Sequence, residues 1–264
     1  MSITQSLSLN GIPGTGKTYG TAKIVTDLGL KAVVLDFEGK QGRTGKYDKT
    51  VSLCFPEMKE HFEVYNLLLP RKESKTETTF RAGKKVTQAD MKIELRNAPD
   101  YLNSFIQLKD SIIDSILARE DFQVLIMDGA VPILRSYMGL EYWKHTHPDR
   151  ENPMSEEWGA MNDIERAFIE AGCGWAEETD GLFIVTGQMK DDYKGDKKVG
   201  ETPCLSVKCQ HSVDVVLELK KSVYRDHTDY ICTCTDSVLG AWVEPVTMER
   251  GISDILLEKG LIEY

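Results

Sequence analysis

The chain reads Gly11-Ile12-Pro13-Gly14-Thr15-Gly16-Lys17-Thr18 in a stretch that matches the pattern G-x-x-x-x-G-K-[ST]. Before it, Leu7 and Leu9 alternate with polar residues, which predicts a short β-strand. After it, the apolar spacing over 17–28 predicts an amphipathic helix that Gly29 can end in a left-handed cap. The pattern therefore lies between a strand and a helix, the context in which it indicates a phosphate-binding loop.

This loop predicts a site for the phosphates of ATP, or of a similar nucleoside triphosphate, with Mg²⁺. Its glycines let the backbone curl so that successive N–H groups face the phosphates, and the positive end of the following helix adds its field. Lys17 is expected to neutralise β- and γ-phosphate oxygens, and Thr18 to place its hydroxyl on Mg²⁺. The predicted nucleotide-binding residues are Gly11, Ile12, Pro13, Gly14, Thr15, Gly16, Lys17 and Thr18.

Asp128 is the second predicted Mg²⁺ residue. It ends the apolar run 122–128, which predicts another buried strand. In a doubly wound sheet this strand would lie beside the first strand, next to the loop, so that Asp128 holds Mg²⁺ through water. The alternative interpretation is an ordinary turn at the end of a strand, formed by Asp128 and Gly129.

Glu38 is the candidate catalytic base. It follows the predicted strand 31–35, and a carboxylate there would share the rim of the sheet with the γ-phosphate. From that position it could orient and deprotonate the attacking water. Asp36 competes for the role, and a solvated loop glutamate is the other interpretation.

Three short stretches resemble the RecA/RadA-like recombinases. Asp36-Phe37-Glu38-Gly39 resembles the signature that supplies their catalytic glutamate. Residues 125–130 are similar to their Walker B strand, and residues 184–188 resemble the strand whose glutamine senses the γ-phosphate. The resemblance, whose order and spacing agree over 7–235, implies that Glu38 is the base and that Gln188 couples the γ-phosphate to the next segment.

The fold that this resemblance implies is α/β. It is a RecA-like P-loop NTPase with a mainly parallel sheet flanked by helices. The segments 213–219 and 230–235 alternate like the strands of a C-terminal antiparallel hairpin. The chain most resembles compact RecA-like core proteins of phages, which are described as nucleotide-binding or single-strand annealing ATPases. The stretch Glu-Trp-Gly-Ala-Met-Asn at 157–162 contributes to this resemblance.

The resemblance implies an ATPase that acts on single-stranded DNA in recombination or annealing, as a ring or filament. The segment 189–203 corresponds to a DNA-facing loop of recombinases. Its candidate DNA contacts are Lys190, Tyr193, Lys194, Lys197 and Lys198. The hairpin strand 230–235 lacks the lysines that some recombinases extend to a neighbouring subunit's phosphate, which leaves three candidates for that role: Lys220, Lys221 and Arg225.

Composition favours one domain over residues 1–264, with a charged surface insertion at 70–99. A net charge of −10 argues against nucleic-acid binding over the whole surface, so any DNA contact must be local or made by an assembly. No apolar run approaches the ~20 residues that span a bilayer, and no secretion signal is evident, so we expect no membrane contact and a cytoplasmic protein, in the host cell if phage-encoded. Four scattered cysteines are predicted to pack in the core rather than bind zinc, namely Cys204, Cys209, Cys232 and Cys234.

Two alternative functions remain open from the sequence. A nucleoside or small-molecule kinase has the same loop but needs a lid with arginines, for which the basic stretch 71–85 is a candidate. A nucleotide-gated protein-binding switch would hydrolyse little, and an acidic surface suits protein partners. An AAA+ motor is disfavoured because its base normally follows the Walker B aspartate, where this chain has Gly129.

Overall fold

The structure is a computed structural model, and it describes residues 4–37, 45–66, 113–130, 143, 147–150, 154, 157–194, 197–247 and 250–263. The insertion predicted at 70–99 lies outside these residues. In the part of the chain that is described, no helix is both long and apolar enough to cross a membrane.

At the centre of the protein, the described residues form a mixed sheet of eight strands. These are β1 Ser6–Gly11, β2 Ala32–Asp36, β3 Phe62–Asn66, β4 Val124–Asp128, β5 Leu182–Gly187, β8 Val215–Val223, β9 Thr228–Asp236 and β10 Trp242–Val246. Their order across the sheet is β10-β9-β8-β1-β5-β4-β2-β3. In this order, every neighbouring pair from β8 across to β3 is parallel, whereas β8 with β9 and β9 with β10 are antiparallel. The predicted α/β class, with a mainly parallel sheet and antiparallel C-terminal strands, is confirmed.

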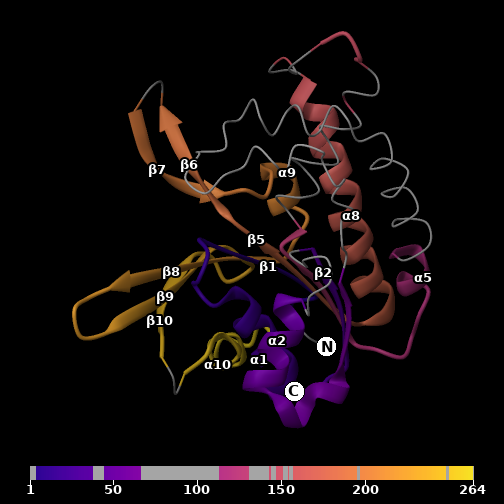
Figure 1. The fold of residues 1–264 in the computed structure, drawn as a ribbon, viewed down its shortest axis with the longest axis vertical. Helices are drawn as coiled ribbons and strands as arrows, with labels where there is room; N and C mark the ends of the chain where they lie inside the picture. Colours follow the sequence, from indigo (N-terminus) through magenta and orange to yellow (C-terminus); the bar gives the residue numbers. More distant parts are fainter. Residues whose placement is uncertain are drawn as a thin grey trace, which may run out of the picture.

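Helices cover both faces of this sheet (Figure 1). Those of the described residues are α1 Lys17–Leu28, α2 Lys46–Cys54, α5 Asp114–Leu117, α8 Trp158–Thr179, α9 Val207–Gln210 and α10 Ile252–Glu258, with a 3₁₀ turn at Pro56–His61. Apolar residues of α1, α2 and α10 bury one face of the sheet, and those of α5 and α8 bury the other. Within β2, Val33 and Leu35 join one core while Ala32 and Val34 join the opposite one, as alternation in a doubly covered strand requires.

A separate antiparallel hairpin follows β5. Its strands are β6 Met189–Lys194 and β7 Lys197–Pro203, and they form a two-stranded sheet that projects from the core (Figure 1). The sequence predicted a loop over 189–203, and that prediction is wrong. Most of the side chains described here are polar and exposed, so no apolar alternation marked the strands, and backbone pairing between β6 and β7 defines them.

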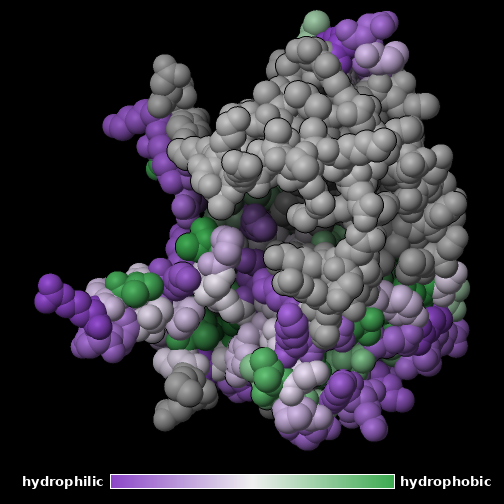
Figure 2. Space-filling model, viewed as in Figure 1, coloured by the Kyte–Doolittle hydropathy of each residue, from purple (hydrophilic) through white to green (hydrophobic). Residues whose placement is uncertain are grey.

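The second projecting element is the hairpin of β8 and β9. Both strands are longer than the sequence indicated, because they continue beyond the core into solvent, where apolar alternation ends. In the face shown in Figure 2 the surface along both projecting hairpins is mainly hydrophilic. Both hairpins thus extend beyond the edge of the sheet at which β1 ends with Gly11.

The cysteines pack where a core residue would. Cys209 belongs to the core on the α8 face, whereas Cys232 and Cys234 belong to the core on the α1 face. Burial raises the pKa of the Cys209 and Cys232 thiols to about 12. Cys204 is partly buried against the same core as Cys209, so these two cysteines and the pair Cys232 and Cys234 lie on opposite faces of the sheet, which a zinc site shared by all four does not permit.

Candidate nucleotide-binding site

The loop 11–18 runs from the end of β1 to the start of α1, and its glycines are needed for different reasons. Gly14 and Gly16 have φ angles of 80° and 89°, in the left-handed region that glycine favours. At Gly11 a Cβ atom would lie 2.5 Å from Oγ1 of Thr15 and 2.7 Å from the carbonyl oxygen of Leu219. The loop therefore needs glycine at two positions for conformation and at one for space.

Lys17 is held by the loop itself. Its Nζ donates hydrogen bonds to the carbonyl oxygens of Gly11 at 2.6 Å and Ile12 at 3.2 Å. Oγ1 of Thr15 also donates to Ile12 O, at 2.9 Å, and both Lys17 and Thr15 are buried. The ammonium group is thus positioned inside the loop, where it can exchange a carbonyl for a phosphate oxygen over a short distance.

Thr18, near the start of α1, contacts Asp128, at the end of β4. Oγ1 of Thr18 donates to Oδ2 of Asp128 at 3.0 Å, and both side chains are buried. The predicted position of the Asp128 strand was wrong, because β5 lies between β1 and β4. Asp128 still reaches Thr18 because α1 packs against β4 as well as against β5 and β1.

Thr186 is a site residue to which the sequence assigned no role. Its Oγ1 donates to Oδ1 of Asp128 at 2.7 Å and accepts from the backbone N–H of Gly129 at 2.8 Å. Each Asp128 oxygen therefore receives a threonine hydroxyl, one from the loop and one from β5. The only signal in the sequence was a polar residue at the end of an otherwise apolar strand, 182–185.

Replacing Thr186 by valine is expected to lower the apparent affinity for Mg²⁺ about tenfold, because Asp128 loses a hydrogen bond that orients it. The free energy of unfolding should also fall by about 1–3 kcal/mol, since the Gly129 N–H is left buried without its acceptor. ATP turnover against Mg²⁺ concentration and thermal unfolding measure the two effects. Thr186→Ser keeps the hydroxyl and is the matched control, so an equal loss of Mg²⁺ affinity in both variants would contradict the orienting role.

Of the two candidate bases, Asp36 and Glu38, the described part of the chain includes Asp36 only. Asp36 is fully buried, and its Oδ2 accepts the backbone N–H of Tyr47 at 3.1 Å, which ties it to the start of α2. Burial raises the pKa of the Tyr47 phenol well above its usual value, and its hydroxyl lies 3.1 Å from that of Thr21. Glu38 lies outside the described residues, but the backbone N–H of Phe37 donates to Asp128 O at 2.9 Å, so the chain passes Asp128 just before Glu38.

Gln188 lies between the loop and the projecting hairpin. Gly187 pairs with Asn10 in the parallel register of β5 and β1, so Gln188 follows at the level of Gly11. Its carbonyl oxygen accepts the N–H of Cys204 at 2.7 Å, which closes the base of the β6–β7 hairpin. This position is the one that coupling between a γ-phosphate and the hairpin would need.

The predicted DNA contacts are spread along this hairpin. Nζ of Lys198 lies 2.6 Å from a carboxylate oxygen of Asp191 and 3.7 Å from one of Glu201, so acidic neighbours offset much of its charge. Lys197 is exposed. The side chains of Tyr193 and Lys194 lie outside the described residues.

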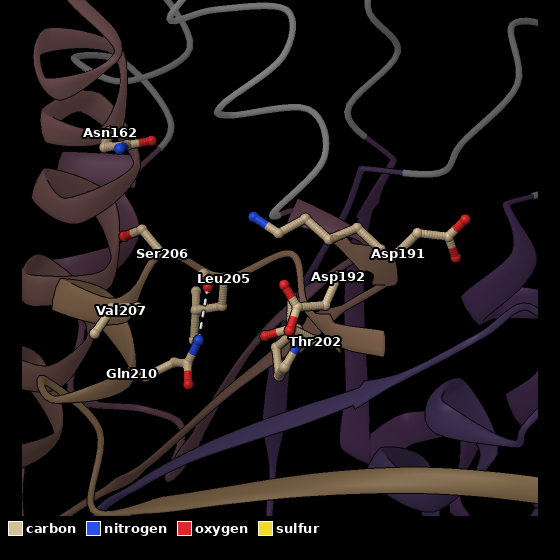
Figure 3. A pocket seen from close by; sticks show the side chains of 10 residues that line it. Asn162, Asp191, Asp192, Thr202, Leu205, Ser206, Val207 and Gln210 are labelled. Atoms are coloured by element: carbon tan, nitrogen blue, oxygen red, sulfur yellow. Dashed lines mark hydrogen bonds between the residues drawn. The ribbon is translucent and has the colours of Figure 1, made fainter. Parts of the chain in front are cut away.

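A cavity of about 520 Å³ opens at the root of the hairpin. Figure 3 shows Asn162 of α8 on one side of it, Ser206 and Leu205 below, and Asp192 and Thr202 of the hairpin opposite. The complete lining is Asn162, Lys190, Asp191, Asp192, Thr202, Pro203, Leu205, Ser206, Val207 and Gln210. No residue of the loop 11–18 lines this cavity, so it is separate from the candidate nucleotide site.

Comparison with known proteins gives a structural likeness without a match in sequence. No protein-family model and no curated protein sequence matches the chain. Among solved structures, the chain is similar to one described as the crystal structure of the RadB recombinase, with a TM-score of 0.48 and 12% sequence identity. That match covers 95% of this chain and 90% of the other. At this level of similarity it assigns no activity to the chain.

Proposed function

We propose that the protein binds ATP with Mg²⁺ on residues 11–18 and hydrolyses it. The observation that carries this proposal is the buried hydrogen bond of 3.0 Å between Thr18 at the end of the loop and Asp128 at the end of β4. A hydroxyl and a carboxylate are ligands suited to Mg²⁺, and Thr18 directly follows Lys17, whose ammonium group the loop carbonyl oxygens hold. Thr18 would bind Mg²⁺ directly and Asp128 through water.

The proposed reaction is in-line attack of water on the γ-phosphate. Lys17 offsets the charge that develops on the phosphate oxygens, and the loop N–H groups hold the phosphate chain in place. Glu38 accepts the proton of the attacking water. Gln188 then transmits the loss of the γ-phosphate to the hairpin, whose base its carbonyl oxygen helps to close.

The proposed role of this turnover is to control binding of single-stranded DNA in recombination or annealing, as in the phage annealing ATPases that the motifs resemble. The support is the hairpin that starts directly after Gln188 and carries exposed basic residues such as Lys197. Lysines of this kind bind phosphates, and an aromatic residue such as Tyr193 can stack on a base. We further propose that the protein assembles into a ring or filament in the cytoplasm, since four lysines among acidic residues make a weak site on a single subunit.

The test is phosphate release from ATP with Mg²⁺, with and without a mixed-sequence single-stranded oligonucleotide. We expect turnover to rise about tenfold or more with the oligonucleotide, and the stimulation to fall as salt is raised, because phosphate contacts release counterions. Replacing both Lys190 and Lys197 by alanine should reduce the stimulation and leave the unstimulated rate within about twofold. The double variant Lys31→Ala with Lys59→Ala removes the same charge far from the hairpin and is the control.

Unchanged turnover, together with no ATP-dependent binding of the oligonucleotide, would rule out the DNA-directed function. Phosphate transfer to an added nucleoside would then favour the kinase alternative. Tight ATP binding with negligible turnover would favour the protein-directed switch.

A further inference from the structure

Strand β8 continues past the phosphate-binding loop. It pairs in parallel with β1, and the register ends with Gly11 opposite Leu219. Beyond this point β1 turns into the loop, whereas β8 runs on to Val223 against β9. Lys221 lies two residues after Leu219 and shares its face of the strand, so the register places Lys221 beside the loop.

The side chain of Lys221 reaches the middle of that loop. A Cβ atom built on Gly14 would lie 2.9 Å from Nζ of Lys221, and among the described residues no other atom beyond the adjacent residues would lie within 4 Å of it. Gly14 belongs to the glycine-rich part of the loop, whose backbone N–H groups are expected to cradle the α- and β-phosphates. A second ammonium group is thus placed at the loop, in addition to that of Lys17.

The charge of Lys221 is available to a ligand. Its neighbour Lys220, on the opposite face of β8, lies 3.4 Å from a carboxylate oxygen of Glu218. Within the described residues, no hydrogen bond or ion pair joins Lys221 to an acidic side chain. The two adjacent lysines therefore differ in surroundings, and only Lys221 faces the loop.

We propose that Lys221 is a nucleotide-binding residue that contacts the α- or β-phosphate on the loop of its own chain. This inference rests on the proposed function, since it needs a nucleotide on residues 11–18. It also reassigns Lys221, which the sequence offered only as a candidate for reaching a neighbouring subunit. A cation there adds to the field of the loop N–H groups and lowers the cost of bringing a polyanion to a protein of net charge −10.

The test compares Lys221→Met with Lys220→Met. Methionine keeps most of the length and apolar stem of lysine, so the β8–β9 pairing should hold. Affinities for ATP with Mg²⁺ and for ADP are measured by isothermal titration calorimetry. We expect Lys221→Met to weaken both about 5- to 30-fold, as loss of one charge-assisted contact to a phosphate shared by both ligands would, and Lys220→Met to stay within about twofold of wild type.

Equal affinities in wild type and Lys221→Met would overturn this inference while leaving the proposed function intact. Failure of the wild type to bind either nucleotide would instead overturn the proposed function. Thermal unfolding without nucleotide should be unchanged in Lys221→Met, and Lys221→Gln gives the same comparison if the methionine variant does not fold.

A mixing experiment separates action within one chain from action between chains. The Lys221→Met and Lys17→Ala proteins are combined in equal amounts and their ATP turnover is measured. If Lys221 serves its own loop, the mixture turns over ATP no faster than the sum of its parts. A gain in the mixture would show that Lys221 of one chain serves the loop of another, and would overturn the assignment.

Discussion

Replacing Lys17 by alanine is expected to lower ATP turnover at least about a hundredfold, one of the two largest losses that we expect from a single substitution. Removing one preorganised electrostatic group at a reacting phosphate typically costs about 10²- to 10³-fold in rate. Lys17 is the proposed group of this kind, and the carbonyl oxygens of Gly11 and Ile12 already hold its ammonium inside the loop. Phosphate release under saturating ATP and Mg²⁺ measures the effect.

The matched control is Lys23→Ala on the same helix. Nζ of Lys23 pairs with both carboxylate oxygens of Asp27 at 2.8–2.9 Å on the surface of α1, away from the loop. This pair is partly buried and joins residues four apart on the helix, an arrangement that contributes about 0.3–0.5 kcal/mol, so turnover should stay within about twofold of wild type. A second readout is the rise in melting temperature on adding ATP with Mg²⁺, which wild type and Lys23→Ala should show and Lys17→Ala should lose. Turnover in Lys17→Ala equal to that of the control would remove the basis for the proposed site.

The loop and its two flanking elements could be predicted from the sequence because short-range physics determines them. Apolar periodicity gives a helix at 17–28, and α1 spans Lys17–Leu28. Gly29 ends it with a φ angle of 64°, the left-handed cap that glycine permits. The glycines of the loop are also explained by local conformation, because the φ angles of Gly14 and Gly16 lie in the left-handed region that glycine favours.

The order of the strands could not be predicted, because it depends on which surfaces pack together over long distances. Apolar runs identified β4 and β5 equally well, but nothing local indicated that β5 lies between β1 and β4. That order also decides which side chains meet. Thr186 contacts Asp128 only because β5 and β4 are neighbours, and Lys221 reaches Gly14 only because β8 pairs with β1.

Polar segments were the other source of error. The β6–β7 hairpin carries charged and polar residues on both faces of its strands, so its sequence lacks the apolar alternation by which a half-buried strand is recognised. The outer ends of β8 and β9 are mostly exposed and mix polar with apolar residues, so the predicted ends of these strands fell short of the observed ones. Exposed hairpins are held together by backbone hydrogen bonds, which any residue type can make, so the sequence gives little indication of their strands.

Asp128→Asn is expected to lower ATP turnover at least about a hundredfold, because it removes the carboxylate that we propose holds Mg²⁺ through water. Asparagine has nearly the same shape and retains a carbonyl oxygen that can accept the hydroxyl of Thr18 or Thr186. The fold should therefore persist, and the melting temperature without nucleotide should change by only a few degrees, about 1 kcal/mol in free energy. Turnover as a function of Mg²⁺ concentration measures the effect. Asp121→Asn is the control, because Asp121 precedes β4, at the opposite end of that strand from Asp128, and pairs with Arg119.

Nucleotide binding without metal distinguishes a Mg²⁺ role from a merely structural one. In EDTA, Asp128→Asn should bind ATP as tightly as wild type or more tightly, because the substitution removes a negative charge near the phosphates. With Mg²⁺ present, the same variant should bind ATP more weakly than wild type, so the metal reverses the order of the two affinities. If Asp128 only ended a strand, the variant would lose stability, and the dependence of binding and turnover on Mg²⁺ would stay that of wild type. The sign of the metal effect, rather than the size of any loss in activity, thus decides whether the Thr18–Asp128 contact marks a metal site.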